Sequence, residues 1–143
     1  MSFLGKVKKK LRNGSWYPFY NTFYEKNNLD PHMILLESRS GKALESNILS
    51  LLKELCQEPY RSFTLVLSVH RDSENEIKEK LQKNSIQGVH FVRTGSVAYY
   101  HALSRAGYLV NDTSFPGRFI KKEGQIYLNT WHGTPLKKMG RDN

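Results

Sequence analysis

Residues 125–140 read Gln125-Ile126-Tyr127-Leu128-Asn129-Thr130-Trp131-His132-Gly133-Thr134-Pro135-Leu136-Lys137-Lys138-Met139-Gly140. The first half of this stretch has the pattern of a β-strand, and a histidine, a glycine and a helix start follow it at once. Gly133 permits a tight turn, Thr134 is a good N-cap, and Pro135 suits the first helical position. Because α/β enzymes keep their ligand-binding residues where strands end, the stretch predicts an α/β fold with a site at this point.

From residue 27 onward the chain alternates strand and helix patterns with short connections. We expect strands at residues 33–37, 63–69, 89–92, 108–111 and 126–131, and helices at 46–57, 72–83 and 96–105, with Gly107 stopping the last helix. This succession predicts a parallel sheet with right-handed crossovers, in the doubly wound order of Rossmann-like folds. The loops at 38–42, 112–116 and 131–135 would then converge on one edge of the sheet.

The same C-terminal stretch carries a family resemblance. The tracts that carry it are Tyr127 to Gly140, Tyr108 to Pro116, Phe119-Ile120-Lys121-Lys122 and, upstream, Ile34 to Ser38 and Gly41-Lys42. In order and spacing they resemble the CDP-glycerol glycerophosphotransferases of bacterial teichoic acid synthesis, closely over residues 108–140. Members of that family pair two Rossmann-like lobes in a GT-B arrangement, and the C-terminal lobe holds most of the nucleotide donor. The resemblance implies that residues 27–143 are the N-terminal lobe, truncated before the donor-binding lobe.

The reaction implied by the resemblance is transfer of glycerol phosphate, or a related polyol phosphate, from a CDP-linked donor to a hydroxyl of a lipid-linked teichoic acid acceptor. The family motif implicates the histidine that matches His132 in catalysis. An alcohol is a poor nucleophile at neutral pH, so His132 is the expected general base. Asp112 is expected to orient His132 or the acceptor. Two structural alternatives stay open, that His132 only bonds the turn and that Asp112 only forms a turn or caps a helix.

A phosphate-binding surface is expected around His132, because a helix N-terminus and lysine side chains favour anions. The predicted contacts are Gly133, Thr134, Lys137, Lys138, Ser38 and Arg39. Neither a dinucleotide-binding nor a P-loop glycine pattern is present, and the histidines are scattered around one cysteine, Cys56. We therefore expect neither a cofactor nor a metal.

Charge is concentrated at the beginning of the chain. The formal net charge is +9, and residues 1–24 hold five basic residues and no acidic one, which indicates an anionic partner. The residues expected to contact a membrane are Phe3, Leu4, Lys6, Val7, Lys8, Lys9, Lys10, Leu11 and Trp16. Read as a helix, they form an apolar face flanked by lysines, so we expect residues 1–26 to be a helical arm on an anionic membrane. Alternatively, the aromatic rings of residues 16–24 pack against the body of the domain.

Location and partner class follow from what the sequence lacks. With no signal peptide, no long apolar run and one cysteine, we expect a peripheral protein at the cytoplasmic face of the bacterial cell membrane. No helix-turn-helix, zinc-finger, RRM or KH pattern accompanies the charge, so nucleic acid is not the expected partner. Two other functions stay open: a non-catalytic membrane adaptor with a Rossmann-like lobe, and a basic polyanion-binding module.

Overall fold

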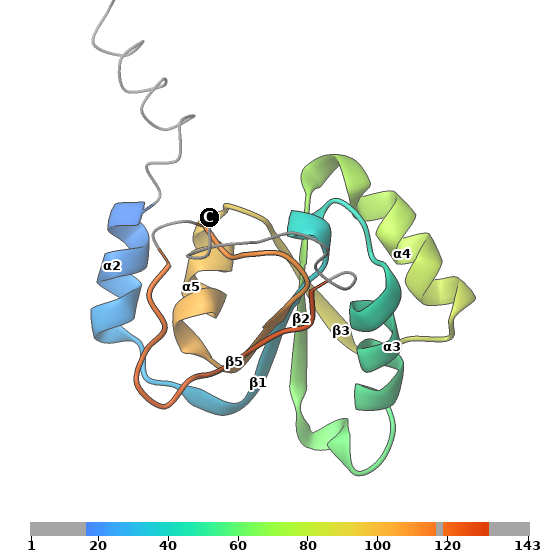
Figure 1. Ribbon diagram of the computed structural model, residues 1–143, viewed down its shortest axis with the longest axis horizontal. Coiled ribbons are helices and arrows are strands. Elements are labelled where there is room, and N and C mark those ends of the chain that lie inside the picture. The colour runs from blue at the N-terminus through green and yellow to red at the C-terminus, as the bar shows by residue number, and fades with distance from the viewer. Residues whose placement is uncertain (1–16, 117–118, 132–143) are drawn as a thin grey trace, which may run out of the picture.

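The computed structural model describes residues 17–116 and 119–131 (Figure 1). The helices and strands are α2 (Tyr17–Lys26), β1 (Asp30–Glu37), α3 (Ser46–Leu55), β2 (Thr64–Val69), α4 (Glu74–Lys83), β3 (Val89–Arg93), α5 (Val97–Arg105), β4 (Ala106–Asn111) and β5 (Ile126–Asn129). Short 3-10 turns lie at η1 (Arg39–Gly41), η2 (Tyr60–Ser62) and η3 (Arg71–Ser73). The predicted contacts at residues 3–16 and 132–138 lie outside the described residues.

The strands form one five-stranded sheet in the order β3-β2-β1-β4-β5, and each neighbouring pair is parallel. The chain moves outward from β1 to β3 and then returns to place β4 on the other side of β1. This is the order of a doubly wound Rossmann sheet, so the predicted fold class is confirmed. The switch point, where such folds bind their ligands, lies at the carboxyl ends of β1 and β4.

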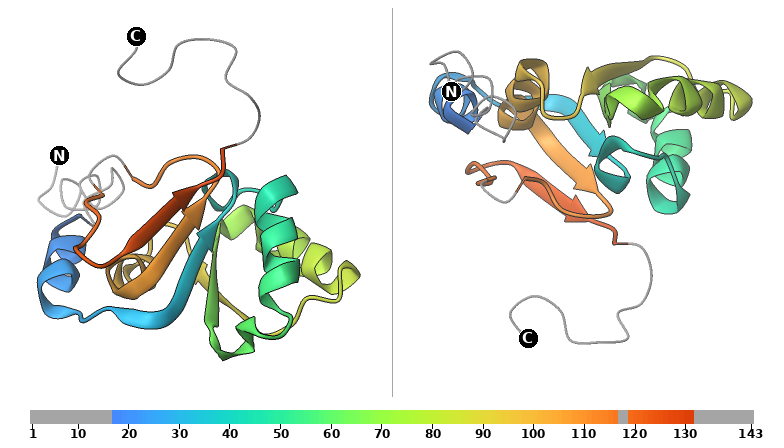
Figure 2. Two further views of the ribbon diagram at one scale, coloured as in Figure 1. Left: turned by 60° about the horizontal axis from the view of Figure 1, so that its bottom comes forward. Right: turned by 90° about the horizontal axis from the view of Figure 1, so that it is seen from above.

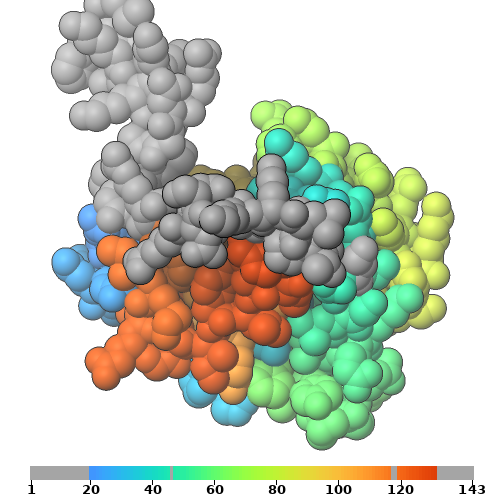
Figure 3. All heavy atoms as spheres, viewed as in Figure 1, coloured from blue at the N-terminus to red at the C-terminus, as the bar shows by residue number. Residues whose placement is uncertain are grey.

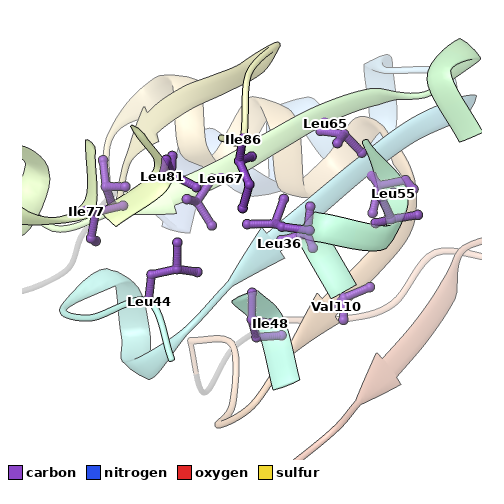
Figure 4. Packing of buried hydrophobic residues seen from close by; sticks show 13 residues of the cluster. Leu36, Leu44, Ile48, Leu55, Leu65, Leu67, Ile77, Leu81, Ile86 and Val110 are labelled. Atoms are coloured by element: carbon purple, nitrogen blue, oxygen red, sulfur yellow. The ribbon is translucent and has the colours of Figure 1, made fainter. Parts of the chain in front are cut away.

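Helices cover both faces of the sheet (Figures 1 and 2). On one face α3 and α4 pack on an aliphatic core, of which Figure 4 shows Leu36, Leu44, Ile48, Leu67 and Ile77 among others. On the other face α2 and α5 contribute Tyr20, Tyr99 and Leu103 to a second core, together with Leu35, Val66 and Leu109 of the strands. Since alternate residues of a strand point to opposite faces, Leu35 and Leu36 of β1 serve different cores.

Tyr20, Phe23 and Tyr24 of α2 pack against the body of the domain. Tyr20 is only 2% exposed, and its hydroxyl donates a hydrogen bond to the carbonyl of Ile120 at 2.7 Å. Its ring lies beside those of Tyr100 and Phe119, and the ring of Phe23 meets His101 edge-on. These rings therefore support the packing alternative, while a membrane-contacting arm stays a prediction for the residues before α2.

Each strand and helix predicted within residues 27–131 is present, but the prediction for Gly107 was wrong. Gly107 does not stop α5, because the helix ends at Arg105 and β4 begins with the next residue. A side-chain carbon at Gly107 would lie 2.7 Å from the carbonyl oxygen of Asp30 and 3.0 Å from the Cα of Pro31. The glycine instead allows the first residues of β4 to approach β1 closely.

The fifth strand lies at an edge of the sheet and is shorter than predicted. It ends at Asn129, because Trp131 adopts a left-handed φ of 49° and its amide bonds to the side chain of Asn129. Figure 3 shows the segment 119–131, coloured orange to red, on the surface. Ile126 is 56% exposed and Leu128 50%, as expected for an edge strand that carries no helix on that face among the described residues.

Candidate functional site

Polar residues replace the apolar ones where β1 and β4 end. β1 closes with Glu37 followed by Ser38, and β4 closes with Asn111 followed by Asp112; all four side chains are buried. Glu37 and Asn111 are register partners across the two strands. The switch point of the sheet is therefore lined by buried polar groups. The residues just before them on each strand are buried and hydrophobic.

Asp112 ties the loop after β1 to the loop after β4. One carboxylate oxygen accepts a hydrogen bond from Ser38 Oγ at 2.8 Å, and the other accepts one from the backbone N–H of Arg39 at 2.8 Å. Ser38 Oγ also accepts a bond from the N–H of Glu45 at 3.2 Å. Asp112 thus holds the two loops together. This role differs from the two predicted from the sequence, orienting His132 or the acceptor and forming a turn or helix cap.

The loop held by this clamp is conformationally strained. Arg39, Ser40 and Gly41 have φ angles of 48°, 55° and 78°, and two of the three carry side chains that disfavour this region. The loop lies over the end of β2, where the N–H of His70 donates to the carbonyl of Gly41 at 2.6 Å. A side-chain carbon at Gly41 would lie 2.2 Å from Thr94 Oγ1, so a glycine is required here. The clamp on the Arg39 amide helps to keep this conformation.

The two predicted phosphate contacts in this loop differ in access. Arg39 is exposed, and its Nε lies 3.1 Å from Glu45 Oε2 in a surface ion pair. Such a pair is worth about 0–1 kcal/mol, so an anionic ligand competes readily for the guanidinium. Ser38 is 1% exposed and its hydroxyl is engaged by Asp112, so a phosphate would have to displace that bond. Both assignments stay predictions.

A row of polar side chains crosses the sheet at its last register. The parallel pairing places Ser68 of β2, Glu37 of β1, Asn111 of β4 and Asn129 of β5 next to one another. Burial raises the pKa of the Glu37 carboxyl, hydrogen-bonding contact with Ser68 and Tyr99 opposes this rise, and the nearby Asp112 adds to it. Glu37, Asn111 and Tyr99 were not among the site residues predicted from the sequence.

Hydrogen bonds hold the end of β5 against β4. The N–H of Thr130 donates to the carbonyl of Asn111 at 2.8 Å, and the hydroxyl of Tyr127 donates to Asn111 Oδ1 at 2.9 Å. The side-chain amide of Asn47, from α3, donates to the carbonyl of Trp131 at 3.1 Å. The chain therefore leaves the sheet at its carboxyl edge. His132, Gly133, Thr134, Lys137 and Lys138 follow Trp131 and lie outside the described residues.

Two further properties concern only residues 17–116 and 119–131. No group of three or more His, Cys, Asp or Glu side chains is placed to hold a metal ion there. None of the helices in that part of the chain is long and apolar enough to cross a membrane.

Several known proteins are similar to this chain in sequence. The teichoic acid poly(glycerol phosphate) polymerase of Staphylococcus epidermidis is 31% identical over 123 residues, which are 86% of this chain and 16% of that protein. The teichoic acid glycerol-phosphate transferase of Staphylococcus aureus is 28% identical over 137 residues, 95% of this chain and 33% of that protein. The chain thus spans a third or less of either relative.

Among solved structures, the wall teichoic acid polymerase TagF superposes with a TM-score of 0.67 and 26% identity, over 100% of this chain and 35% of that chain. A structure of TagF after a soak with CDPG gives a TM-score of 0.68 at 26% identity. Residues 19–143 match the family described as CDP-Glycerol:Poly(glycerophosphate) glycerophosphotransferase. This match includes the clamped switch point and the whole segment that follows β5, and the chain therefore belongs to the CDP-glycerol:poly(glycerophosphate) glycerophosphotransferase family.

Proposed function

We propose that this chain forms the acceptor-side lobe of a transferase that moves glycerol phosphate from CDP-glycerol to a lipid-linked teichoic acid acceptor. Family membership and the names of the relatives support the reaction class. The observation that carries the proposal is the bonding of β5 to β4, which brings Trp131 to the edge where Asp112 joins the loops. His132 is the next residue in the sequence, which supports the proposal that the family's histidine acts near this edge.

The proposed chemistry is a single displacement at phosphorus. The acceptor hydroxyl attacks the phosphorus that carries glycerol, a new O–P bond forms, the bond from that phosphorus to CMP breaks, and CMP leaves. His132 takes the proton of the attacking hydroxyl, because a neutral alcohol needs a general base. In this proposal, the helix start that the sequence predicts at Gly133 and Thr134, with Lys137 and Lys138, stabilises the charge on the phosphoryl oxygens.

The loop residues have separate proposed tasks. Arg39 contacts substrate phosphate from the surface, in exchange for its ion pair with Glu45. Asp112 acts as a positioning residue, because both of its carboxylate oxygens already accept bonds from the loop after β1. It holds the loops against which the acceptor is placed.

A membrane location fits a lipid-linked acceptor. We propose that residues 3–16 bind the anionic cytoplasmic surface through an apolar face and flanking lysines, as a peripheral contact. The donor would be held mainly by the second lobe that family members carry. A membrane adaptor without catalytic activity would show the same vesicle binding but no dependence of transfer on His132.

The test joins this lobe to the donor-binding region that the proposal requires, and compares His132→Ala with His90→Ala. His90 is an exposed residue of β3, away from the switch point, and serves as the matched control. His132→Ala should lower kcat by about 10²- to 10⁴-fold while donor Kd and Tm stay near wild type. Near-normal turnover of His132→Ala would refute the general-base assignment. A lower Tm with a small loss of rate would identify a structural turn histidine instead.

A further inference from the structure

Trp131, the last residue that the structure describes, adopts a backbone conformation that its side chain disfavours. Its φ of 49° lies in the left-handed region, which is uncommon for any residue other than glycine. Such strain persists only where the surrounding contacts over-determine the conformation, and it collects at functional sites. The contacts that maintain this conformation are therefore candidates for a functional role.

Asn129 holds Trp131 from the end of β5. Its Oδ1 accepts a hydrogen bond from the backbone N–H of Trp131 at 2.9 Å, and its Nδ2 donates one to the carbonyl of Thr113 at 2.5 Å. An asparagine that accepts from the N–H two residues further on forms a turn that mimics a backbone turn. Asn129 thus joins the turn at Trp131 to the loop that follows β4.

Asn47 holds the same turn from α3. Its Nδ2 donates to the carbonyl of Trp131 at 3.1 Å and lies 3.4 Å from the carbonyl of Thr130. Asn47 is an exposed residue of the first turn of α3, so it contributes little to the core. The N–H and the carbonyl of Trp131 are therefore bonded to asparagines of two different elements. We call Asn47 and Asn129 the asparagine bracket.

The pairing of β5 with the sheet does not explain the asparagine bracket. Register pairing with β4 and the bond from the N–H of Thr130 to the carbonyl of Asn111 already hold the strand. A turn with this φ also needs no strain, because a glycine at the position of Trp131 would adopt it freely. The bonds to Trp131 instead fix the direction in which the chain leaves the sheet.

We propose that the asparagine bracket positions the segment that begins with His132 for the transfer reaction, so that Asn47 and Asn129 are positioning residues. A peptide unit is planar, so bonds to both the N–H and the carbonyl of Trp131 restrain where the next residue begins. This inference rests on the proposed function, since it assigns the residues that hold the proposed base in place. The proton transfer itself belongs to His132.

The first measurement is the rate of transfer by the enzyme that joins this lobe to a donor-binding region. Asn129→Ala and Asn47→Ala should each lower kcat by about 10- to 100-fold, because a displacement of about 1 Å is enough for such a loss. The KM for CDP-glycerol should change little, since the donor is held mainly by the other lobe. A raised KM with an unchanged kcat would overturn the proposal.

The matched control is Asn84→Ala. Asn84 lies just after α4, and its Nδ2 donates to the carbonyl of Lys80 at 2.7 Å, so the substitution removes a similar bond away from the switch point. All three variants should lower Tm by similar amounts, but Asn84→Ala should leave kcat unchanged. A merely structural bracket predicts that none of the three variants lowers kcat, and this result would overturn the proposal.

The second measurement is the exchange of the Trp131 backbone amide with solvent, followed by NMR on the labelled 143-residue chain. Asn129→Ala removes the acceptor of this amide and should speed its exchange by about two- to tenfold. Asn84→Ala should leave the exchange unchanged. An equal exchange rate in Asn129→Ala and the wild type would show that Asn129 does not hold Trp131.

His132→Ala, measured in the same transfer assay, separates this inference from the proposed function. If His132→Ala lowers kcat and the bracket variants do not, only the positioning role is refuted. If the bracket variants lower kcat and His132→Ala does not, the positioning of the segment stands and the proposed base is refuted.

Discussion

Replacing Glu37 by glutamine should stabilise the domain at neutral pH and remove the part of the pH dependence of its free energy of unfolding that Glu37 causes. Burial raises the pKa of this carboxyl above its ordinary value of 4.5, and the carboxylate of Asp112 raises it further. A raised pKa means that the folded state binds the proton more tightly than the unfolded state. The stability that Glu37 contributes is therefore complete below the ordinary pKa and is lost as the pH rises through the pKa of the folded protein.

The size of the effect is bounded by one proton. Where Glu37 is ionised in the unfolded chain and protonated in the folded one, the free energy of unfolding of the wild type falls by at most about 1.4 kcal/mol per pH unit. Glu37→Gln keeps the shape and hydrogen-bonding capacity but cannot ionise. The difference in free energy of unfolding, wild type minus variant, should thus decrease from pH 4 to pH 8.

Other titrating groups near Glu37 must not obscure this slope. The ones that face it are Asp112, just after β4, and Tyr99 and Tyr100 from α5. Burial is the main cause that raises the pKa of both tyrosines above 10, so they stay neutral throughout this range. Asp112 is present in both proteins and cancels in the difference, except through its coupling to Glu37.

Urea unfolding at several pH values, followed by circular dichroism, measures the difference. Glu74→Gln is the control with the opposite sign, because a hydrogen bond and an ion pair with Lys78 lower the pKa of Glu74. The wild-type advantage over Glu74→Gln should exist above the ordinary pKa and disappear as the pH falls through the lowered one. A difference for Glu37→Gln that is flat, or that grows with pH, would refute the reasoning about its burial.

Three further perturbations test other parts of the structure. Asp112→Ala removes both acceptors of the clamp and should lower the free energy of unfolding by about 3 kcal/mol. Asp112→Asn keeps one acceptor and should lower it less. Denaturant unfolding of both variants checks this, and equal stability of Asp112→Ala and wild type would contradict it. Gly107→Ala places a carbon against Asp30 and should lower the free energy of unfolding by about 1–3 kcal/mol, because the new contact is a steric clash. Denaturant unfolding measures this, and an unchanged free energy of unfolding would show that β1 can move aside. Deleting residues 1–16 should abolish sedimentation with anionic vesicles, and binding of the wild type should weaken as the salt concentration rises. Unchanged binding after the deletion would refute the proposed membrane contact.

The sheet could be predicted from the sequence because patterns among neighbouring residues identify each of its strands and helices. An apolar run such as 63–69 and a helical pattern such as 72–83 each identify an element from neighbouring residues, and their alternation fixes a parallel sheet. Element ends were less predictable because tertiary contacts set them. Gly107 resembles a helix stop in sequence, and only the proximity of Asp30 shows why a glycine is needed in β4.

The candidate site could be predicted only in outline. Doubly wound order predicts that residues 38–42 and 112–116 meet, and the bonds from Ser38 and Arg39 to Asp112 confirm that they do. The buried pair Glu37 and Asn111 could not be found in this way. Glu37 is separated from Asn111 by more than 70 residues, and their adjacency depends on the register of β1 against β4, which short-range patterns do not specify. The available signal was a carboxylate that ends an otherwise apolar strand.

The two carboxyl groups at the switch point make opposite contributions, and this difference separates structure from function. Asp112 has partners on both oxygens, so its loss should destabilise the fold. Glu37 has an unpartnered oxygen and a raised pKa, so its neutral isostere should increase stability near pH 7. A side chain that lowers the stability of its own fold is not explained by packing. If Glu37→Gln stabilises the lobe, a role at the switch point explains this carboxyl better than packing does.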